Sequence, residues 1–133
     1  MENIDKYIGI LHKFNGRDFD GCDCLGLCSL FYKEHGWEQT FDDGRPITKD
    51  WEKREPFRLA RYLNGHFTRE NDYEKLQFGD IILFDVLGDS HLGIYLGYGK
   101  VLAMQVPTIE GETSSTIYHR DFWQKGFKAG YKR

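Results

Sequence analysis

A run of alternating apolar residues begins at Ile81 and limits what the second half of this chain can form. Residues 81–86, 91–97 and 100–106 each have the period of a β-strand, with a predicted loop at 87–90 and a turn at 98–99 between them. Short connections of this kind join antiparallel neighbours, so we expect a meander. Pro107 is expected to end the third strand, and a short strand near 116–118 to extend the sheet.

The first part of the chain has helical spacing instead. One set of apolar residues predicts a first helix over residues 3–14: Ile4, Tyr7, Ile8, Leu11 and Phe14. A second helix is expected from Asp23 or Cys24 to about His35, with Asp23 as its cap and Gly36 as its stop. Helices followed by strands indicate the α+β class, with N-terminal helices packed on an antiparallel β-sheet.

Residues 38–71 are weakly patterned, and we expect a surface excursion there. A turn is predicted at 42–46, followed by a helix over 51–63 that Pro56 interrupts. Three aromatic residues in or near this stretch are candidates to line a cleft: Trp37, Trp51 and Phe57.

Length and charge exclude several classes of protein. A chain of 133 residues has the length of a single domain, which can fold without disulfide bonds or structural metals. A net charge of −3 provides no basic excess for nucleic-acid binding. No apolar run approaches the length of a membrane-spanning helix, and the N-terminus lacks the features of a secretory signal. We therefore expect synthesis in the cytoplasm.

Three cysteines lie within seven residues: Cys22, Cys24 and Cys28. An odd number of cysteines in one local cluster does not form a disulfide framework. Structural zinc sites usually have a second pair of ligands a dozen or more residues away, and this chain lacks one at suitable spacing. We therefore expect neither a metal nor a cofactor. Cys24 stands in the first helical turn, where unpaired N–H groups and the helix dipole favour a thiolate nucleophile; the alternative is a small buried residue. Cys28 is expected in the core one turn later, and Cys22 to be partly exposed and without chemistry.

His91 begins an alternating strand beside Gly93. Leu92 and its apolar neighbours are expected to face the core, so the opposite face would leave space beside the imidazole, as a general base in a cleft requires. Gln105 is the polar side chain on that face that could hold the imidazole tautomer. A turn centred on Gly97 would put Ala103 opposite His91, and one centred on Tyr98 would put Gln105 there. A surface histidine and a solvated glutamine remain the alternatives.

Three ordered motifs resemble the NlpC family of papain-like cysteine peptidases, which cleave bacterial cell-wall peptides. They are Asp23-Cys24-Leu25-Gly26-Leu27, Gly79-Asp80-Ile81-Ile82-Leu83-Phe84 and His91-Leu92-Gly93-Ile94-Tyr95-Leu96-Gly97. The resemblance implies one minimal papain-like domain over residues 1–133, with Cys24 as nucleophile and His91 as base.

The same resemblance implies the supporting residues. Asp23 and Gly26 belong to the nucleophile motif, and His12 falls where the family often has an oxyanion-side tyrosine. The family's third polar residue, commonly histidine, is Ala103 here. Gln105 could replace it, a Cys/His pair could act alone, or the site could be impaired.

The implied substrate is the stem peptide of peptidoglycan, cut between D-Glu and the diamino acid. The segment from Phe14 to Arg17, followed by Gly21, resembles phage tail-associated members. We therefore expect phage tail proteins as partners and action at the bacterial cell wall from the virion. The alternatives are a catalytically impaired structural or tail-assembly protein on the same fold, or another amidase or acyltransferase.

Overall fold

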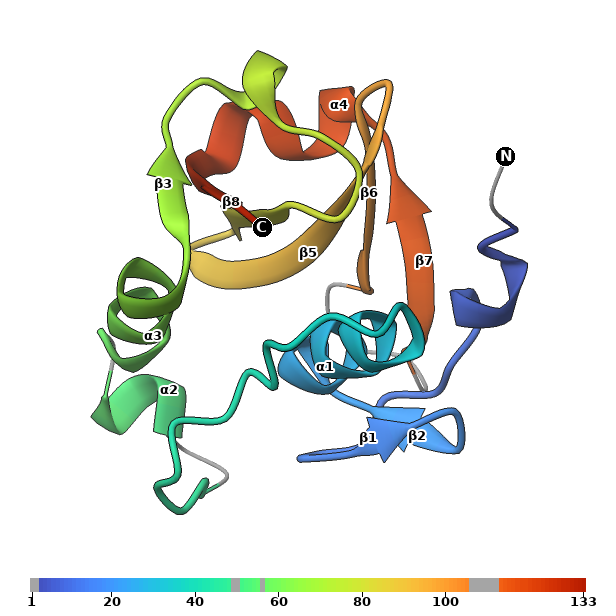
Figure 1. The fold of residues 1–133 in the computed structure, drawn as a ribbon, viewed down its shortest axis with the longest axis vertical. Helices are drawn as coiled ribbons and strands as arrows, with labels where there is room; N and C mark the ends of the chain where they lie inside the picture. The colour runs from blue at the N-terminus through green and yellow to red at the C-terminus, as the bar shows by residue number, and fades with distance from the viewer. Residues whose placement is uncertain (1–2, 49–50, 56, 106–112) are drawn as a thin grey trace.

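The computed structural model describes residues 3–48, 51–55, 57–105 and 113–133, and its centre is an antiparallel six-stranded sheet (Figure 1). The strands follow the order β3-β8-β4-β5-β6-β7. Their bounds are Thr68–Glu70 (β3), Ile81–Val86 (β4), Asp89–Gly97 (β5), Lys100–Met104 (β6), Ser115–Tyr118 (β7) and Phe127–Lys132 (β8). The predicted meander is confirmed as β4 to β7. Strands β3 and β8 extend the sheet beyond β4 and were not predicted, and Pro107 lies outside the described residues.

Two tight turns connect β4 to β5 and β5 to β6. Leu87 and Gly88 have φ of 52° and 86°, and Tyr98 and Gly99 have φ of 54° and 78°. Consecutive positive φ values produce two-residue turns whose twist matches that of the flanking strands. The predicted loop over 87–90 is therefore wrong in its second half, because Asp89 pairs with Val86 and continues the ladder.

Helix α1 (Cys24–Glu34) confirms the second predicted helix. Asp23 is its N-cap, and Gly36 follows its end with a φ of 72°. The predicted helix over 3–14 is wrong, since only a short 3₁₀ turn, η1 (Asp5–Tyr7), forms there. The amides of Gly9 and Ile10 bond instead to the backbone and side-chain oxygens of Ser115 in β7. Pairing with a distant strand thus replaces local helix formation.

Residues 38–71 contain more structure than a surface excursion. Helix α2 (Trp51–Arg54) and helix α3 (Arg58–His66) flank Pro56, which is outside the described residues. Phe41, Trp51 and Leu63 are buried in the main core, so the predicted excursion is only partly correct.

Apolar side chains pack on both faces of the sheet. Helix α1 covers one face, and α4 (Arg120–Trp123) with η3 (Gln124–Gly126) covers the other (Figure 1). The core on the α4 side includes Phe84, Tyr95, Val101, Ala103 and Trp123, and η2 (Tyr73–Lys75) packs there through Tyr73. The expectation of a single core face is therefore wrong. The α+β class itself is confirmed.

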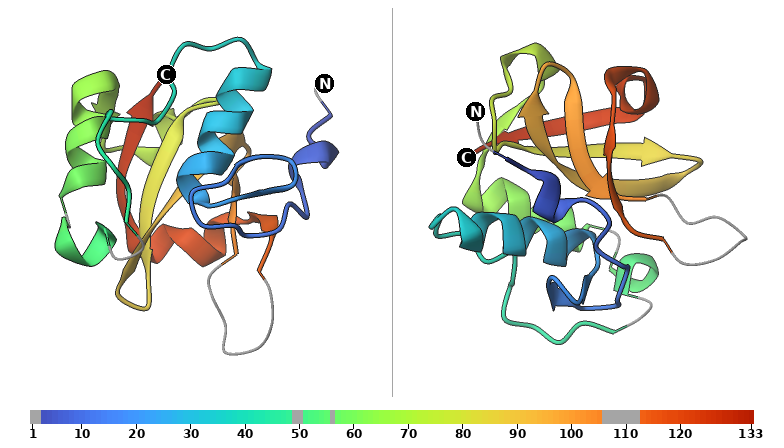
Figure 2. Two further views of the ribbon diagram at one scale, coloured as in Figure 1. Left: turned by 90° about the horizontal axis from the view of Figure 1, so that it is seen from below. Right: turned by 90° about the vertical axis from the view of Figure 1, so that its right-hand side faces the viewer.

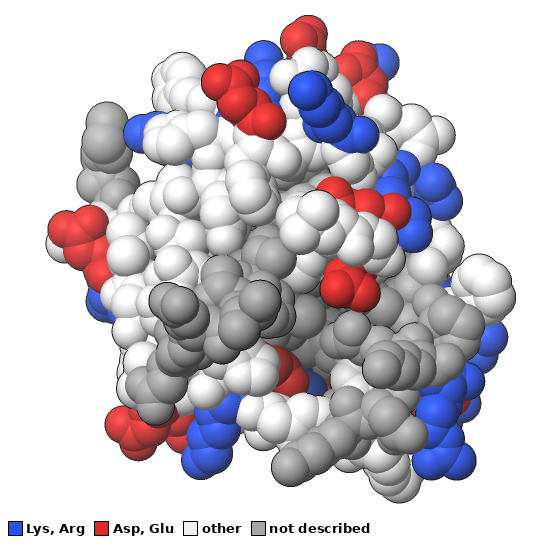
Figure 3. Space-filling view, turned by 180° about the vertical axis from the view of Figure 1, so that it is seen from behind, with Lys and Arg blue, Asp and Glu red and all other residues white. Residues whose placement is uncertain are grey.

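A small hairpin lies beside the first turn of α1 (Figure 2). It consists of β1 (Arg17–Asp18) and β2 (Gly21–Cys22). None of the helices in the described ranges is long and apolar enough to span a membrane. On the face seen in Figure 3, acidic and basic side chains are interspersed, so its described part carries no continuous basic patch.

Candidate active site

A cavity of about 300 Å³ brings together five of the six predicted site residues. Its wall includes Cys24, His91, Gln105, His12 and Asp23. The first turn of α1 supplies Cys24, and the start of β5 supplies His91, 67 positions later in the chain. Folding thus places a thiol and an imidazole on one cavity, where the two could serve nucleophilic catalysis.

Asp23 fixes the helix start next to the thiol. Its Oδ1 accepts a 2.7 Å hydrogen bond from the Gly26 amide, and its Oδ2 accepts a 2.9 Å bond from the Asn15 amide. The Asp23 carbonyl also accepts from the Leu27 amide at 2.8 Å. Asp23 therefore occupies the N–H groups of Gly26 and Leu27, and these two donors are not available to a reaction intermediate.

Gly26 has a packing role. A Cβ at this position would lie 1.8 Å from the Gly16 carbonyl oxygen and 3.0 Å from the Cys22 Cβ. The missing side chain allows the turn before β1 to approach α1 closely. Gly26 is buried and is not among the residues that line the cavity, so the structure supports a close approach of another element rather than of substrate.

His91 is half-buried, and its burial favours the neutral form of the ring. Its Nε2 is buried and has no hydrogen-bond partner among the described residues, and its ring lies 5.8 Å from that of Phe84. Burial lowers the pKa of His91 from its ordinary value, while Asp89 and Asp85 act in the opposite direction. A neutral imidazole is the form that can accept a proton from a thiol.

The sequence predicted open space beside the imidazole, next to Gly93, and this prediction is wrong. A Cβ on Gly93 would lie 2.5 Å from the Val101 Cγ1 and 3.2 Å from the Ala103 Cβ. Those side chains belong to the core on the α4 side. Only the His91 end of this strand face borders the cavity.

Gln105 lies at the cavity wall with a different partner. Gly93 pairs with Ala103, and this register, continued by two residues, puts Gln105 opposite His91, which is the second of the two predicted alternatives. The turn itself pairs Gly97 with Lys100, and a β-bulge between Tyr95 and Gly97 produces the one-residue shift. The Gln105 Oε1 accepts a 3.0 Å hydrogen bond from the Ser114 amide. Ala103 is buried and offers no polar group. Orientation of His91 by Gln105 stays a prediction.

His12 reaches the same wall from the N-terminal segment. It is exposed, its amide donates to the Thr113 carbonyl at 2.8 Å, and it forms an isolated bridge with Cys22. Phe14, its neighbour two residues on, also lines the cavity. A contact of His12 with an oxyanion stays a prediction.

The other two cysteines are buried and unsuited to thiolate chemistry. Cys28 is fully buried as predicted, and burial raises its pKa. Cys22 is also fully buried, which contradicts the expected exposure; burial, then Asp23 and Asp18, raise its pKa to about 12. Cys24 is partly exposed at the cavity. Within the described ranges, no group of three or more His, Cys, Asp or Glu side chains could hold a metal ion.

Several cavity residues escaped the sequence analysis. Asp89, Ser90 and Met104 line it. Asp89 and Ser90 stand directly before His91, and only their assignment to a loop concealed them. Trp51 was a cleft candidate and does line the cavity, whereas Trp37 stacks on His35 and Phe57 is 71% exposed.

Comparisons with known proteins agree with this arrangement. A family model described as the NlpC/P60 family matches residues 9–130. The structure is similar to the crystal structure of the NlpC/p60 domain of the peptidoglycan hydrolase SagA, with a TM-score of 0.59 and 20% sequence identity. The match covers 97% of this chain and 92% of that one, and shows that the fold is shared. No curated protein matches the sequence.

Proposed function

Because the chain belongs to the NlpC/P60 family, which comprises cysteine peptidases and hydrolases of peptidoglycan, we propose that it cleaves peptidoglycan stem peptides with Cys24 as nucleophile and His91 as general base. The observation that carries this proposal is the common cavity of Cys24 and His91. Of the three cysteines, all of which lie in the described residues, Cys24 lines this cavity. The lowered pKa of His91 favours the neutral imidazole, which can accept a proton.

The proposed reaction is acyl transfer to water. His91 takes the Cys24 thiol proton, the thiolate attacks the peptide carbonyl, and the C–N bond breaks as the imidazolium returns the proton to the leaving amine. A water molecule, deprotonated by His91, then attacks the thioester, and the thiol is released. We assign the contact with the oxyanion to backbone N–H groups at the start of α1, including that of Cys24.

We further propose that the cleaved bond lies between D-Glu and the diamino acid. The support is the resemblance of the Cys24 and His91 motifs to peptidases with this substrate class. Purified protein and Cys24→Ala would be incubated with peptidoglycan, with Cys22→Ala as the matched cysteine control, and the products identified by mass spectrometry. We expect new D-Glu carboxyl termini from wild type and Cys22→Ala alone. Identical fragments from wild type and Cys24→Ala would contradict hydrolysis by Cys24.

We also propose that the protein acts at the cell wall as part of a phage tail. The support is the segment from Phe14 to Arg17 with Gly21, which resembles tail-associated members and forms the turn and hairpin beside Cys24. Peptides of this chain should be found by mass spectrometry in purified tail particles and remain there after a high-salt wash. Their absence from the particles, with presence in the host lysate, would exclude this location.

A second candidate function is a structural tail component without catalysis. Buried Ala103 in place of a polar third residue, together with the Gln105–Ser114 bond, favours it. This candidate predicts normal assembly into tails by Cys24→Ala and no peptidoglycan cleavage by wild type.

A further inference from the structure

Trp51 forms part of the catalytic cavity but belongs to an element that cannot hold it in place alone. Its side chain is 7% exposed and lines the cavity that contains Cys24. Helix α2 (Trp51–Arg54) is a single turn of four residues. So short a helix is unstable in isolation, because nucleation costs more than one turn of hydrogen bonds returns. Contacts from other elements must therefore determine where the indole lies.

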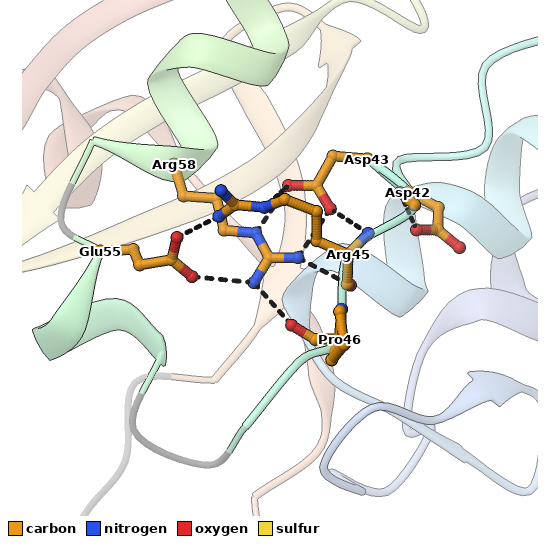
Figure 4. Close-up of polar contacts among 7 residues, drawn as sticks. Asp42, Asp43, Arg45, Pro46, Glu55 and Arg58 are labelled. Atoms are coloured by element: carbon orange, nitrogen blue, oxygen red, sulfur yellow. Dashed lines mark hydrogen bonds and ion pairs between the residues drawn. The ribbon is translucent and has the colours of Figure 1, made fainter.

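Arg58, at the start of α3, makes the contacts that join these elements (Figure 4). Its Nε and Nη2 donate to the two carboxylate oxygens of Asp43, each at 2.6 Å. Nη2 also donates to the Arg45 carbonyl at 2.9 Å, and Nη1 donates to the Pro46 carbonyl at 3.0 Å and to Glu55 at 3.2 Å. These five bonds use all five N–H groups of the guanidinium, which is why a cation can be 7% exposed here.

Asp43 and Arg58 stabilise each other's charged form near neutral pH. The hydrogen bond from Arg58, partly opposed by desolvation, lowers the pKa of Asp43 to about 2. The bond to Asp43 raises the pKa of Arg58 in turn. Arg45 pairs with Glu55 on the outer side of the same cluster. The loop at 43–46, the residue after α2 and the first turn of α3 are thus fixed to one another.

The guanidinium also lies over the Trp51 ring, with Cζ 5.9 Å from its centroid. This distance is within reach of a cation–π interaction. Trp51 and Arg58, together with Leu25, also line a second, small cavity of about 20 Å³. The Trp51 side chain thus interacts with Arg58 and also lines the cavity that contains Cys24.

We propose that Arg58 is a positioning residue, whose guanidinium holds the Trp51 indole as the wall of the cavity that contacts the bound peptide. This inference rests on the proposed function. Arg58 does not reach the cavity and acts only through Trp51. Loss of the Arg58 contacts should weaken peptide binding while leaving the chemistry of Cys24 unchanged.

A double-mutant cycle between Arg58 and Trp51 tests this coupling. We expect Arg58→Lys and Trp51→Leu each to raise KM for a stem peptide by about tenfold with kcat within about twofold. The double variant should be no worse than the poorer single variant. Arg61→Lys is the matched control, since Arg61 is exposed on the same helix with no described side-chain bond, and its KM should be unchanged. Multiplied effects in the double variant would overturn the proposal.

A measurement without substrate separates this inference from the proposed function. Protein labelled with 5-fluorotryptophan gives one ¹⁹F signal per tryptophan, and Trp51→Phe assigns that of Trp51. Arg58→Lys should shift or broaden the Trp51 signal, while the signals of Trp37 and Trp123 stay in place. An unchanged Trp51 signal in folded Arg58→Lys would refute the positioning role even if the protein hydrolyses nothing. If Arg58→Lys does not fold, Asp43→Asn replaces it, because this change weakens the contact between Asp43 and Arg58 from its exposed side. An unchanged Trp51 signal in folded Asp43→Asn would then refute the positioning role.

Discussion

The Gly26 amide donates a 2.7 Å hydrogen bond to the Asp23 Oδ1, and this bond sets the first turn of α1, where Cys24 stands. Asp23→Ala removes the acceptor for both the Gly26 and the Asn15 amides. We expect a loss of about 1–2 kcal/mol in the free energy of unfolding, measured by urea denaturation. Asp72→Ala is the control, because Asp72 caps the exposed turn η2 through a similar bond to Glu74. If the free energy of unfolding falls no more in Asp23→Ala than in Asp72→Ala, the Asp23 cap stabilises the fold no more than an exposed cap does.

Two helical glycines have opposite surroundings and should respond oppositely to alanine. A Cβ on Gly26 would meet the Gly16 oxygen at 1.8 Å, whereas a Cβ on Gly65 in α3 would meet nothing within 4 Å. Gly26→Ala should lower the free energy of unfolding by about 1–3 kcal/mol or more through overpacking. Gly65→Ala should raise it by about 0.5–1 kcal/mol through helix propensity. Thermal melting of both variants checks the signs, and a stable Gly26→Ala would contradict the close approach of the two backbones.

His91 should control the acidic limb of the rate profile. The base acts when neutral, so activity falls as the pH drops through the pKa of His91, which burial lowers below 6.5. Asp89 raises that pKa, and Asp89→Asn should therefore move the acidic limb of kcat/KM to lower pH, by up to about one unit. Asp121→Asn, an exposed change in α4, should leave the limb in place. A limb that moves to higher pH in Asp89→Asn contradicts the assigned base.

Ser115 ties the N-terminal segment to β7. Its buried hydroxyl accepts a 2.9 Å bond from the Ile10 amide and donates to the Tyr7 carbonyl. Ser115→Ala leaves both backbone groups without this partner, and we expect a loss of about 1–3 kcal/mol in the free energy of unfolding. Ser114→Ala, which removes a less buried hydroxyl, should cost less, and equal losses would exclude the proposed anchor.

The elements found correctly from the sequence are those specified by local signals. Asp23 and Gly36 mark the ends of α1, and Tyr98-Gly99 forms the predicted two-residue turn between β5 and β6. That turn alone pairs Gly97 with Lys100, and a β-bulge between Tyr95 and Gly97, which the sequence did not predict, shifts the register by one residue so that its continuation puts Gln105 opposite His91. Cys24 is the first residue of α1 and His91 is the third residue of β5, so both lie near the start of such elements, which is why sequence alone could place them.

The errors concern contacts between distant parts of the chain. The apolar residues from Ile4 to Phe14 have helical spacing, yet the Ile10 amide donates its hydrogen bond to Ser115, more than a hundred positions later. Strand β8 enters the sheet between β3 and β4, which no periodicity encodes. Cys22 precedes α1 and looked exposed, but the hairpin β1–β2 buries it. The second core behind β5 includes Trp123, whose ring partners Tyr73 and Tyr95 are remote from it in sequence.

The central claim is that Cys24 is the activated nucleophile and that its reactivity depends on His91. Site-resolved alkylation of the three cysteines by iodoacetamide, followed by mass spectrometry, tests it most directly. In native protein near pH 7, Cys24 should react at least about a hundredfold faster than Cys22 and Cys28, whose pKa values burial raises, and His91→Gln should slow Cys24 alone. Equal rates for the three thiols, or an unchanged Cys24 rate in folded His91→Gln, would contradict the account.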